Sequence, residues 1–193
     1  MTEPKVTKEI EALLQNSRPG VKLDVGCGGN KQNGFIGLDM RDLPGVDIVH
    51  NAEEFPYPLP GESCSIILCS HLIEHIKPWL MINFMNELWR LLEVNGQLWA
   101  SMPYATSFGF VQDPTHCNPC NEATWQYFDP QYPLYNIYTP KPYRIQQSIY
   151  RETGNMEIVL VKRSLEELAQ IQTPKLAGND IPEEEINNPK EDA

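Results

Sequence analysis

The sequence is poor in positive charge. It holds 15 lysine and arginine residues against 26 aspartate and glutamate residues, so its formal net charge is −11. Proteins that bind a phosphate backbone present a positive surface that releases counterions, and we therefore expect nucleic acid to be a disfavoured partner. Eight of the acidic residues, against two lysines, follow Arg163. If the chain holds a protein partner, this acidic tail and the aromatic loop over residues 129–142 are the candidate segments.

Long apolar runs and a regular cysteine pattern are also missing. The longest apolar runs have the length of a strand, so we expect no membrane span. The first eleven residues are charged and lack the apolar stretch of a signal peptide. Five cysteines at irregular spacings do not form a disulfide framework. We therefore expect a cytoplasmic protein with one domain over residues 1–163, followed over 164–193 by a short helix and an acidic, disordered tail.

Apolar periodicity predicts an α/β fold. Short apolar runs between turn residues predict five strands, at 21–25, 35–38, 46–49, 65–68 and 98–102, and helical spacing predicts a long helix over 78–93 that Asn95-Gly96 ends. Further expectations are an amphipathic helix over 6–15, an irregular stretch over 104–121, a short helix over 122–128, an aromatic loop over 129–142 and an antiparallel hairpin of 143–150 with 156–161. Apolar strands that are buried on both faces, with one long helix before the fifth strand, favour a mostly parallel sheet. Such a sheet binds ligands at the carboxyl ends of its strands.

Two motifs follow the first two predicted strands. The run Leu23-Asp24-Val25-Gly26-Cys27-Gly28-Gly29 places glycines where the backbone turns tightly and approaches a ligand. A dinucleotide-binding pattern requires glycine at position 31, which is Lys31 here, so a nicotinamide-linked oxidoreductase is the weaker alternative. Asp39 ends the second strand, where its carboxylate either accepts the hydroxyl hydrogens of a ribose or stabilises a turn.

These motifs, with those that follow them, resemble class I S-adenosylmethionine-dependent methyltransferases, in particular the type 11 methyltransferase-domain group. The resemblance covers about residues 21–128 and rests on LDVGCGG, GFIGLD, DIVHNAEEFPYPLP, SHLIEHI, ELWRLLEVNGQL and DPTH in that order. It implies a Rossmann-like, mostly parallel sheet closed by a C-terminal antiparallel hairpin. It also implies S-adenosyl-L-methionine as the cofactor and methyl transfer to an acceptor, for which the charge favours a small molecule.

The resemblance assigns cofactor contacts to residues at the ends of the predicted strands. They are Asp24, which steadies the glycine loop, Gly26 and Gly28 along the methionine part, Asp39 on the ribose, Met40, Asn51 and Ala52 around the adenine, and Ser70 and His71 beside the sulfonium. One departure concerns the first crossover. Only residues 26–34 join the first two strands, which is too few for a crossover that contains a helix, so we expect that helix to be reduced to a turn.

The catalytic candidates come from two histidine-containing segments. Methyl transfer is an in-line displacement in which positioning supplies most of the rate, and a hydroxyl or ring-carbon acceptor also benefits from a general base. His116 is the first candidate base, with Asp113 as its orienting partner or as an alternative base, and His71 is the second candidate.

Two patterns resemble metal sites. His71-Leu72-Ile73-Glu74-His75 matches the inverted zinc-protease motif, but it leaves a buried strand and soon meets Pro78, so no sustained helix carries both histidines. His116 precedes Cys117-Asn118-Pro119-Cys120, which is half of a zinc site without a second pair. We expect no metal, and whether His116, Cys117 and Cys120 bind one stays open. A methyltransferase-like binding protein without activity is the alternative function.

Overall fold

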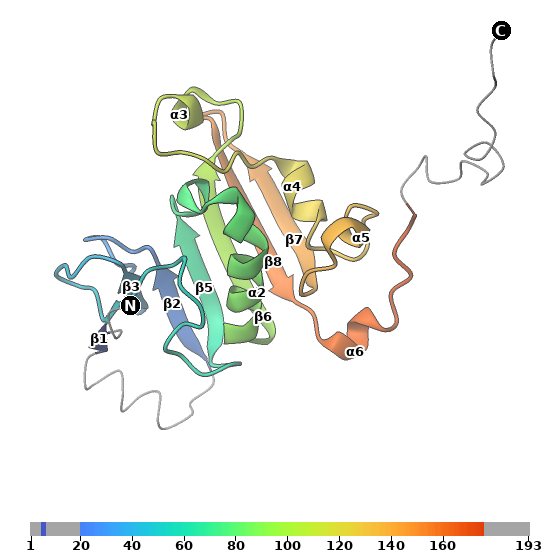
Figure 1. The fold of residues 1–193 in the computed structure, drawn as a ribbon, viewed down its shortest axis with the longest axis horizontal. Coiled ribbons are helices and arrows are strands. Elements are labelled where there is room, and N and C mark those ends of the chain that lie inside the picture. Colours follow the sequence, from blue (N-terminus) through green and yellow to red (C-terminus); the bar gives the residue numbers. More distant parts are fainter. Residues whose placement is uncertain (1–4, 7–19, 176–193) are drawn as a thin grey trace, which may run out of the picture.

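The computed structural model describes residues 5–6 and 20–175, and these build one eight-stranded sheet (Figure 1). In sheet order its strands are β1 (Lys5–Val6), β4 (Ile48–Val49), β3 (Ile36–Asp39), β2 (Val21–Val25), β5 (Cys64–Ser70), β6 (Leu92–Pro103), β8 (Asn155–Lys162) and β7 (Tyr143–Tyr150). The five strands from β4 to β6 are parallel, whereas β1, β8 and β7 pair antiparallel with their neighbours. The predicted fold class is confirmed.

The strand order creates a switch point between β2 and β5. After β2 the chain adds β3 and β4 on one side, and it then returns to β5 and β6 on the other side. Connections that leave the two neighbouring strands in opposite directions open a crevice beyond their carboxyl ends. The segments that follow β2, β3, β4 and β5 therefore meet at one edge of the sheet.

The long helix lies before β6, as predicted, but its ends differ from the expectation. Pro78–Leu80 form a 3₁₀ turn (η2), Met81–Leu91 form α2, and Phe84, Leu88 and Leu91 are fully buried in the core that α2 shares with the sheet. The expectation that Asn95-Gly96 ends this helix is wrong. Leu92 is already extended and opens β6, and Asn95 adopts a φ of 67° within the irregular start of that strand.

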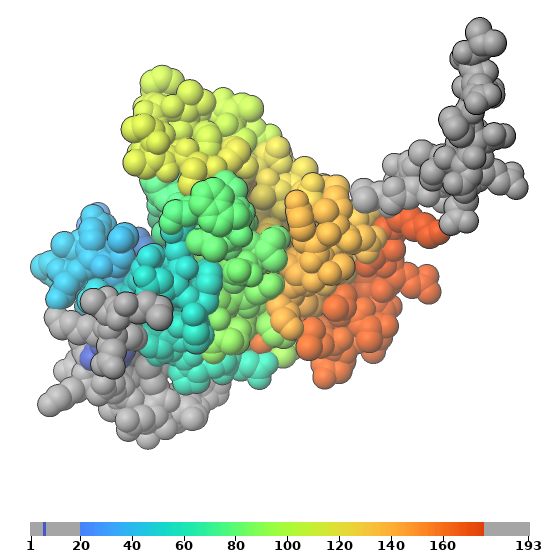
Figure 2. All heavy atoms as spheres, viewed as in Figure 1, coloured from blue at the N-terminus to red at the C-terminus, as the bar shows by residue number. Residues whose placement is uncertain are grey.

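The remaining helices are short. Ile73–His75 form a 3₁₀ turn (η1), followed later by α3 (Phe108–Val111), α4 (Glu122–Gln126), α5 (Tyr135–Tyr138) and α6 (Leu165–Leu168). The predictions of an irregular stretch over 104–121 and a loop over 129–142 missed α3 and α5, because a four-residue helix is too short to leave a periodic pattern in the sequence. Ser107 starts α3 by accepting a hydrogen bond from the backbone N–H of Phe110. Figure 2 shows the segment around α3 as a lobe that projects beyond the sheet.

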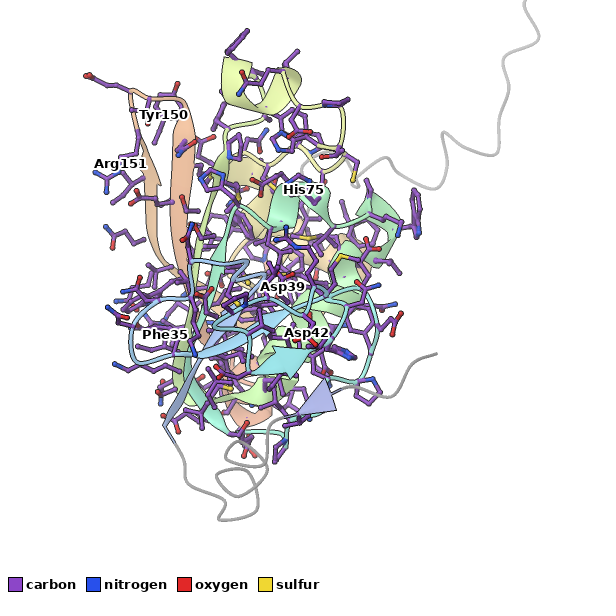
Figure 3. The ribbon with its side chains drawn as sticks, turned by 90° about the vertical axis from the view of Figure 1, so that its left-hand side faces the viewer. Phe35, Asp39, Asp42, His75, Tyr150 and Arg151 are labelled. Carbon is purple, nitrogen blue, oxygen red and sulfur yellow. The ribbon has the colours of Figure 1, made fainter. Side chains whose placement is uncertain are left out.

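The antiparallel hairpin is present, and β7 and β8 stand at one side of the molecule with Tyr150 and Arg151 at the tip (Figure 3). The helix predicted over 6–15 lies outside the described residues, except that Val6 belongs to β1. The acidic tail beyond residue 175 also lies outside them.

The first crossover has no helix. The ten residues 26–35, all of them described, form turns and irregular backbone, in agreement with the short connection predicted over 26–34. The Asp24 carboxylate accepts a hydrogen bond from the backbone N–H of Gln32 at 2.8 Å and so ties the loop back to β2. Leu68 and Trp99 continue the row of Asp24 across the sheet, and Trp99 is 38 % exposed. The loop covers this face of the sheet less completely than a helix would.

Candidate functional site

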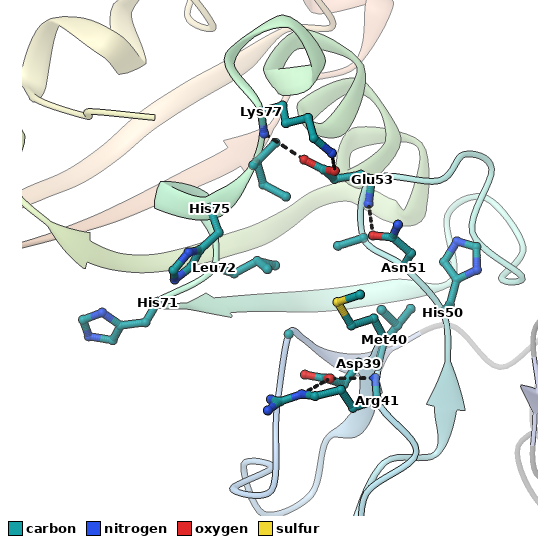
Figure 4. A pocket seen from close by; sticks show the side chains of 14 residues that line it. Asp39, Met40, Arg41, His50, Asn51, Glu53, His71, Leu72, His75 and Lys77 are labelled. Carbon is teal, nitrogen blue, oxygen red and sulfur yellow. Dashed lines mark hydrogen bonds and ion pairs between the residues drawn. The ribbon is translucent and has the colours of Figure 1, made fainter. Parts of the chain in front are cut away.

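A pocket of about 510 Å³ opens at the switch point (Figure 4). Its walls come from the four segments that follow β2, β3, β4 and β5. The lining residues are Gly26, Leu38, Asp39, Met40, Arg41, His50, Asn51, Ala52, Glu53, His71, Leu72, His75, Ile76 and Lys77. Six of the predicted cofactor residues are thereby brought to one cavity, namely Gly26, Asp39, Met40, Asn51, Ala52 and His71.

Asp39 is the carboxylate in the wall of the pocket beside the glycine loop. Its Oδ2 accepts a hydrogen bond from the Gly28 backbone N–H at 2.9 Å, and its Oδ1 accepts from the backbone N–H and the Nε of Arg41 at 2.9 and 3.1 Å. Burial acts to raise the pKa of the Asp39 carboxyl, but these donors prevail and hold that pKa below its usual value. Asp39 is therefore an ionised acceptor at neutral pH.

Gly26 lets the backbone itself form part of the pocket wall. Its φ of 74° is a conformation that favours glycine, and its N–H donates to the Leu38 carbonyl at 2.7 Å. A Cβ added at Gly26 would lie 2.9 Å from Cδ1 of Leu72. A side chain here would therefore press on Leu72, which also lines the pocket.

The loop after β4 is fixed by its own hydrogen bonds. Asn51 Oδ1 accepts from the Glu53 backbone N–H at 3.0 Å, and the Ala52 carbonyl accepts from the Tyr57 hydroxyl at 2.8 Å. The Glu53 carboxylate forms an ion pair with Lys77 Nζ and also accepts the Lys77 backbone N–H at 2.8 Å. These contacts link the segment after β4 to the segment after β5 across the pocket.

His71 and His75 lie at one end of the pocket, and His50 lies at the opposite end (Figure 4). His71 leaves β5 with a φ of 52°, an uncommon conformation for a residue with a side chain. Its Nδ1 lies 3.1 Å from Oε1 of the buried Glu74. This hydrogen bond raises the pKa of the His71 imidazole against the opposing effect of burial.

His116 and Asp113 do not line the pocket. The His116 side chain is 8 % exposed, its Nδ1 is bonded to the Phe110 carbonyl at 3.0 Å, and its ring packs edge-on against His75 at 4.7 Å between centroids. Asp113 Oδ2 lies 3.8 Å from His116 Nε2. The other oxygen of Asp113 accepts from the backbone N–H and the hydroxyl of Thr115 at 2.8 and 2.7 Å. Asp113 thus orients Thr115 more closely than it orients His116.

Three predicted cofactor residues also lie outside the lining. Asp24 and Gly28 hold the glycine loop through their bonds to Gln32 and Asp39, and Ser70 is the exposed last residue of β5. The structure adds Arg41, Glu53, His75 and Lys77 to the pocket. Arg41 follows Asp39 closely, but no local pattern marked the ion pair between Glu53 and Lys77.

Neither of the two metal-like sequence patterns has the geometry that its motif requires. Cys117 is exposed and its thiol donates to the His75 and Ile76 carbonyls, whereas Cys120 is buried and bonded to the Asn118 carbonyl. The pair therefore does not present its two thiols together. In the other pattern, His71 precedes the η1 turn and His75 ends it, so the two histidines do not share a helix.

Comparison with known proteins rests on structure. No model of a known protein family matches the chain, and no curated protein matches its sequence. Solved structures do match, and one is an S-adenosylmethionine-dependent methyltransferase from Archaeoglobus fulgidus, with a TM-score of 0.54 and 16 % identity over 80 % of this chain and 94 % of that chain. The fold is that of class I methyltransferases.

Two further matches show what this fold supports. The 1,6-didemethyltoxoflavin-N1-methyltransferase from Burkholderia thailandensis, solved with bound 1,6-didemethyltoxoflavin and S-adenosylhomocysteine, has a TM-score of 0.54 and 12 % identity over 81 % of this chain and 78 % of its own. The [4+2]-cyclase SpnF has a TM-score of 0.53 and 14 % identity over 80 % of each chain. At these identities the likeness concerns the fold. None of the helices in the described part of the chain has the length and apolar character needed to cross a bilayer.

Proposed function

We propose that the protein binds S-adenosyl-L-methionine in the pocket at the switch point and transfers its methyl group to a small-molecule acceptor. The observation that carries the proposal is the ionised Asp39 carboxylate in the pocket wall, at the end of β3 and beside the glycine loop. Ribose hydroxyls are hydrogen-bond donors, and an acidic residue in this position of an α/β sheet is suited to accept from them. The pocket volume falls in the range of small-molecule sites.

We assign each part of the cofactor to a part of the lining. The methionine part runs along the backbone of Gly26, which lines the pocket beside Leu72. The adenine packs on Met40, whose side chain is 66 % exposed. Asn51 meets the adenine edge with the remaining lone pair of Oδ1 and with its amide hydrogens. This arrangement directs the sulfonium toward the end of the pocket that His71 lines.

Ribose binding requires Arg41 to move. A carboxylate offers about four lone-pair sites, and Asp39 already accepts from Gly28 N, Arg41 N and Arg41 Nε. Two ribose hydroxyls need one site more than remains. The Arg41 side chain is 63 % exposed, so its guanidinium exchanges Asp39 for water at small cost.

The acceptor enters at the histidine end of the pocket. The transfer breaks the bond between the methyl carbon and sulfur and forms a bond from that carbon to the acceptor, so alignment of the reacting atoms is the main requirement. His71 borders this end directly, whereas His116 and Asp113 reach it only through His75 and Thr115. We therefore place His71 nearest to the transferred methyl.

Binding and turnover are tested separately, because the same fold also supports a [4+2]-cyclase. Calorimetry with S-adenosylhomocysteine measures binding, and incubation with methyl-labelled S-adenosylmethionine and a small-molecule extract measures transfer. We expect saturable binding and a labelled product. Binding without transfer would favour the inactive binding protein. Binding of NADH in place of S-adenosylhomocysteine would overturn the proposal in favour of an oxidoreductase.

A further inference from the structure

We propose that Glu74, His75 and His116 bind a divalent transition-metal ion beside the pocket. One ligand atom from each of the three side chains lies within 4.8 Å of the others. Two distant segments supply them, the η1 turn after β5 and the loop that follows β6 and α3. The backbone N–H groups of Cys117 and Asn118 both donate to the Glu74 carbonyl, at 2.9 and 3.1 Å, and so hold the two segments together.

Glu74 is a buried carboxylate with an unused oxygen. Its side chain is 1 % exposed, its Oε1 contacts His71 Nδ1 at 3.1 Å, and its Oε2 has no hydrogen-bond partner among the described residues. A buried charged oxygen is costly unless it is hydrogen-bonded or coordinates a metal. The fold has thus placed a carboxylate with spare binding capacity beside two imidazoles.

Hydrogen bonds fix the tautomer of both imidazoles. The Phe110 carbonyl only accepts, so His116 Nδ1 carries the hydrogen of their 3.0 Å contact. The Thr115 hydroxyl gives its hydrogen to Asp113 Oδ1, so it accepts from His75 Nδ1 at 3.1 Å. In each neutral ring the lone pair is therefore on Nε2. Metal-binding histidines are usually oriented in this way, because the ring nitrogen that does not bind the metal donates its hydrogen to a carbonyl or another polar acceptor.

The ligand set selects the class of ion. Two imidazoles and one carboxylate are ligands for Zn²⁺ and related first-row ions, whereas Mg²⁺ and Ca²⁺ prefer oxygen alone. Zinc–ligand bonds of about 2.1 Å bring tetrahedral donors to ~3.4 Å from each other. The ligand atoms lie within 4.8 Å of one another, so the three side chains must draw closer together when an ion binds. Three protein ligands leave a fourth position open.

The open position defines the acceptor, and this step rests on the proposed function. His75 belongs both to the metal cluster and to the pocket lining, so the ion lies next to the methyl-transfer site. An ion there binds the oxygen of an acceptor hydroxyl and lowers its pKa. The hydroxyl loses its proton to solvent, its oxygen takes the methyl carbon, and the carbon–sulfur bond electrons return to sulfur. The acceptor is accordingly an alcohol or a phenol.

The first test measures metal binding by the full chain without a histidine tag. After dialysis against EDTA, the protein is titrated with Zn²⁺ in competition with a fluorescent chelator and with Co²⁺ under visible spectroscopy. We expect about one equivalent of Zn²⁺ per chain. Glu74→Gln and His116→Ala should weaken zinc binding by about 100-fold or more, because each removes a ligand. Thr115→Val should weaken it by about 10-fold, because Thr115 does not bind the ion and only orients His75.

Two variants serve as controls. His50→Ala removes a histidine at the opposite end of the pocket and should keep the zinc affinity. Cys117→Ser should keep it as well, because the Cys117 thiol faces the His75 and Ile76 carbonyls. Loss of zinc in Cys117→Ser with retention in His116→Ala would move the site to the cysteines and overturn the inference. Equal zinc affinity in wild type and Glu74→Gln would overturn it too.

Measurement of S-adenosylhomocysteine binding on the same samples separates this inference from the proposed function. Cofactor binding without specific zinc binding removes the metal site and leaves the methyltransferase proposal standing. Zinc binding without cofactor binding does the reverse. Thermal unfolding of Glu74→Gln, which keeps the size of the side chain, shows whether a lost site reflects lost ligands or a lost fold.

Discussion

At the scale of single residues, the function proposed here depends on Asp39. Asp39→Ala removes the acceptor for the ribose hydroxyls and should weaken S-adenosylhomocysteine binding by about 1–3 kcal/mol, the usual range for hydrogen bonds to a charged group. The matched variant is Arg41→Ala, which removes the guanidinium hydrogen bond to Oδ1 of Asp39 and keeps the bond from the Arg41 backbone N–H. It should bind as tightly as wild type or more tightly. Calorimetry on both variants decides, and weak binding by Arg41→Ala alone would assign the recognition to the guanidinium.

A comparison of two glycines with similar backbone conformations distinguishes the effect of backbone strain from that of a steric clash in the pocket. Gly26 and Gly34 have φ values of 74° and 80°, but a Cβ contacts Leu72 only at Gly26 and meets nothing within 4 Å at Gly34. Both alanine variants should lose about 1–2 kcal/mol of stability from the left-handed backbone. Only Gly26→Ala should also lose cofactor affinity, by about tenfold or more, because its methyl group displaces Leu72 in the pocket wall. Similar affinities in the two variants would show that the glycine loop does not contact the ligand.

At the scale of elements, Lys162 joins the end of β8 to β6 and α2. Its side chain is 1 % exposed, and its Nζ donates to the Leu92 carbonyl at 2.6 Å, pairs with Glu62 at 3.1 Å and lies 4.0 Å from the centre of the Trp89 ring. Lys162→Ala should cost about 2–3 kcal/mol of unfolding free energy, because it leaves a buried carbonyl unpaired and removes a cation from an aromatic face.

Lys141 provides the control, since its ammonium lies 5.3 Å from the same ring but the residue is exposed. Lys141→Ala should change stability by less than about 0.5 kcal/mol. Urea unfolding of both variants tests the comparison. Equal losses would show that the contact with Trp89, rather than burial and the Leu92 carbonyl, holds these elements together.

At the scale of the whole molecule, most of the sheet was predictable because most of its strands contain a short apolar run that ends in turn residues. The two-residue strand β1 was not predicted. The helix-free first crossover followed from chain length alone, because nine residues do not accommodate a helix. The start of β6 was not predicted, because Leu92 continues the helical apolar spacing of α2 although its backbone is already extended.

The candidate site was also predictable only in part. Asp39 ends β3 and Gly26 directly follows β2, where the fold class alone places them at the pocket. The meeting of Glu74 and His75 with His116 could not be predicted, because it depends on how the loop after β6 folds back on the η1 turn. That contact rests on backbone hydrogen bonds to the Glu74 carbonyl, which leave no trace in the residue types.

Ligand binding should stabilise the entire chain, because the pocket joins the ends of four strands. A ligand at one hundred times its dissociation constant adds about 2.7 kcal/mol to the stability of the folded state. For a chain of this size we expect S-adenosylhomocysteine to raise the melting temperature by about 5–10 °C. Asp39→Ala should require a higher concentration for the same shift, and NADH should give none. An absent shift with S-adenosylhomocysteine, in a wild-type sample that unfolds cooperatively, would mean that this pocket does not hold the cofactor.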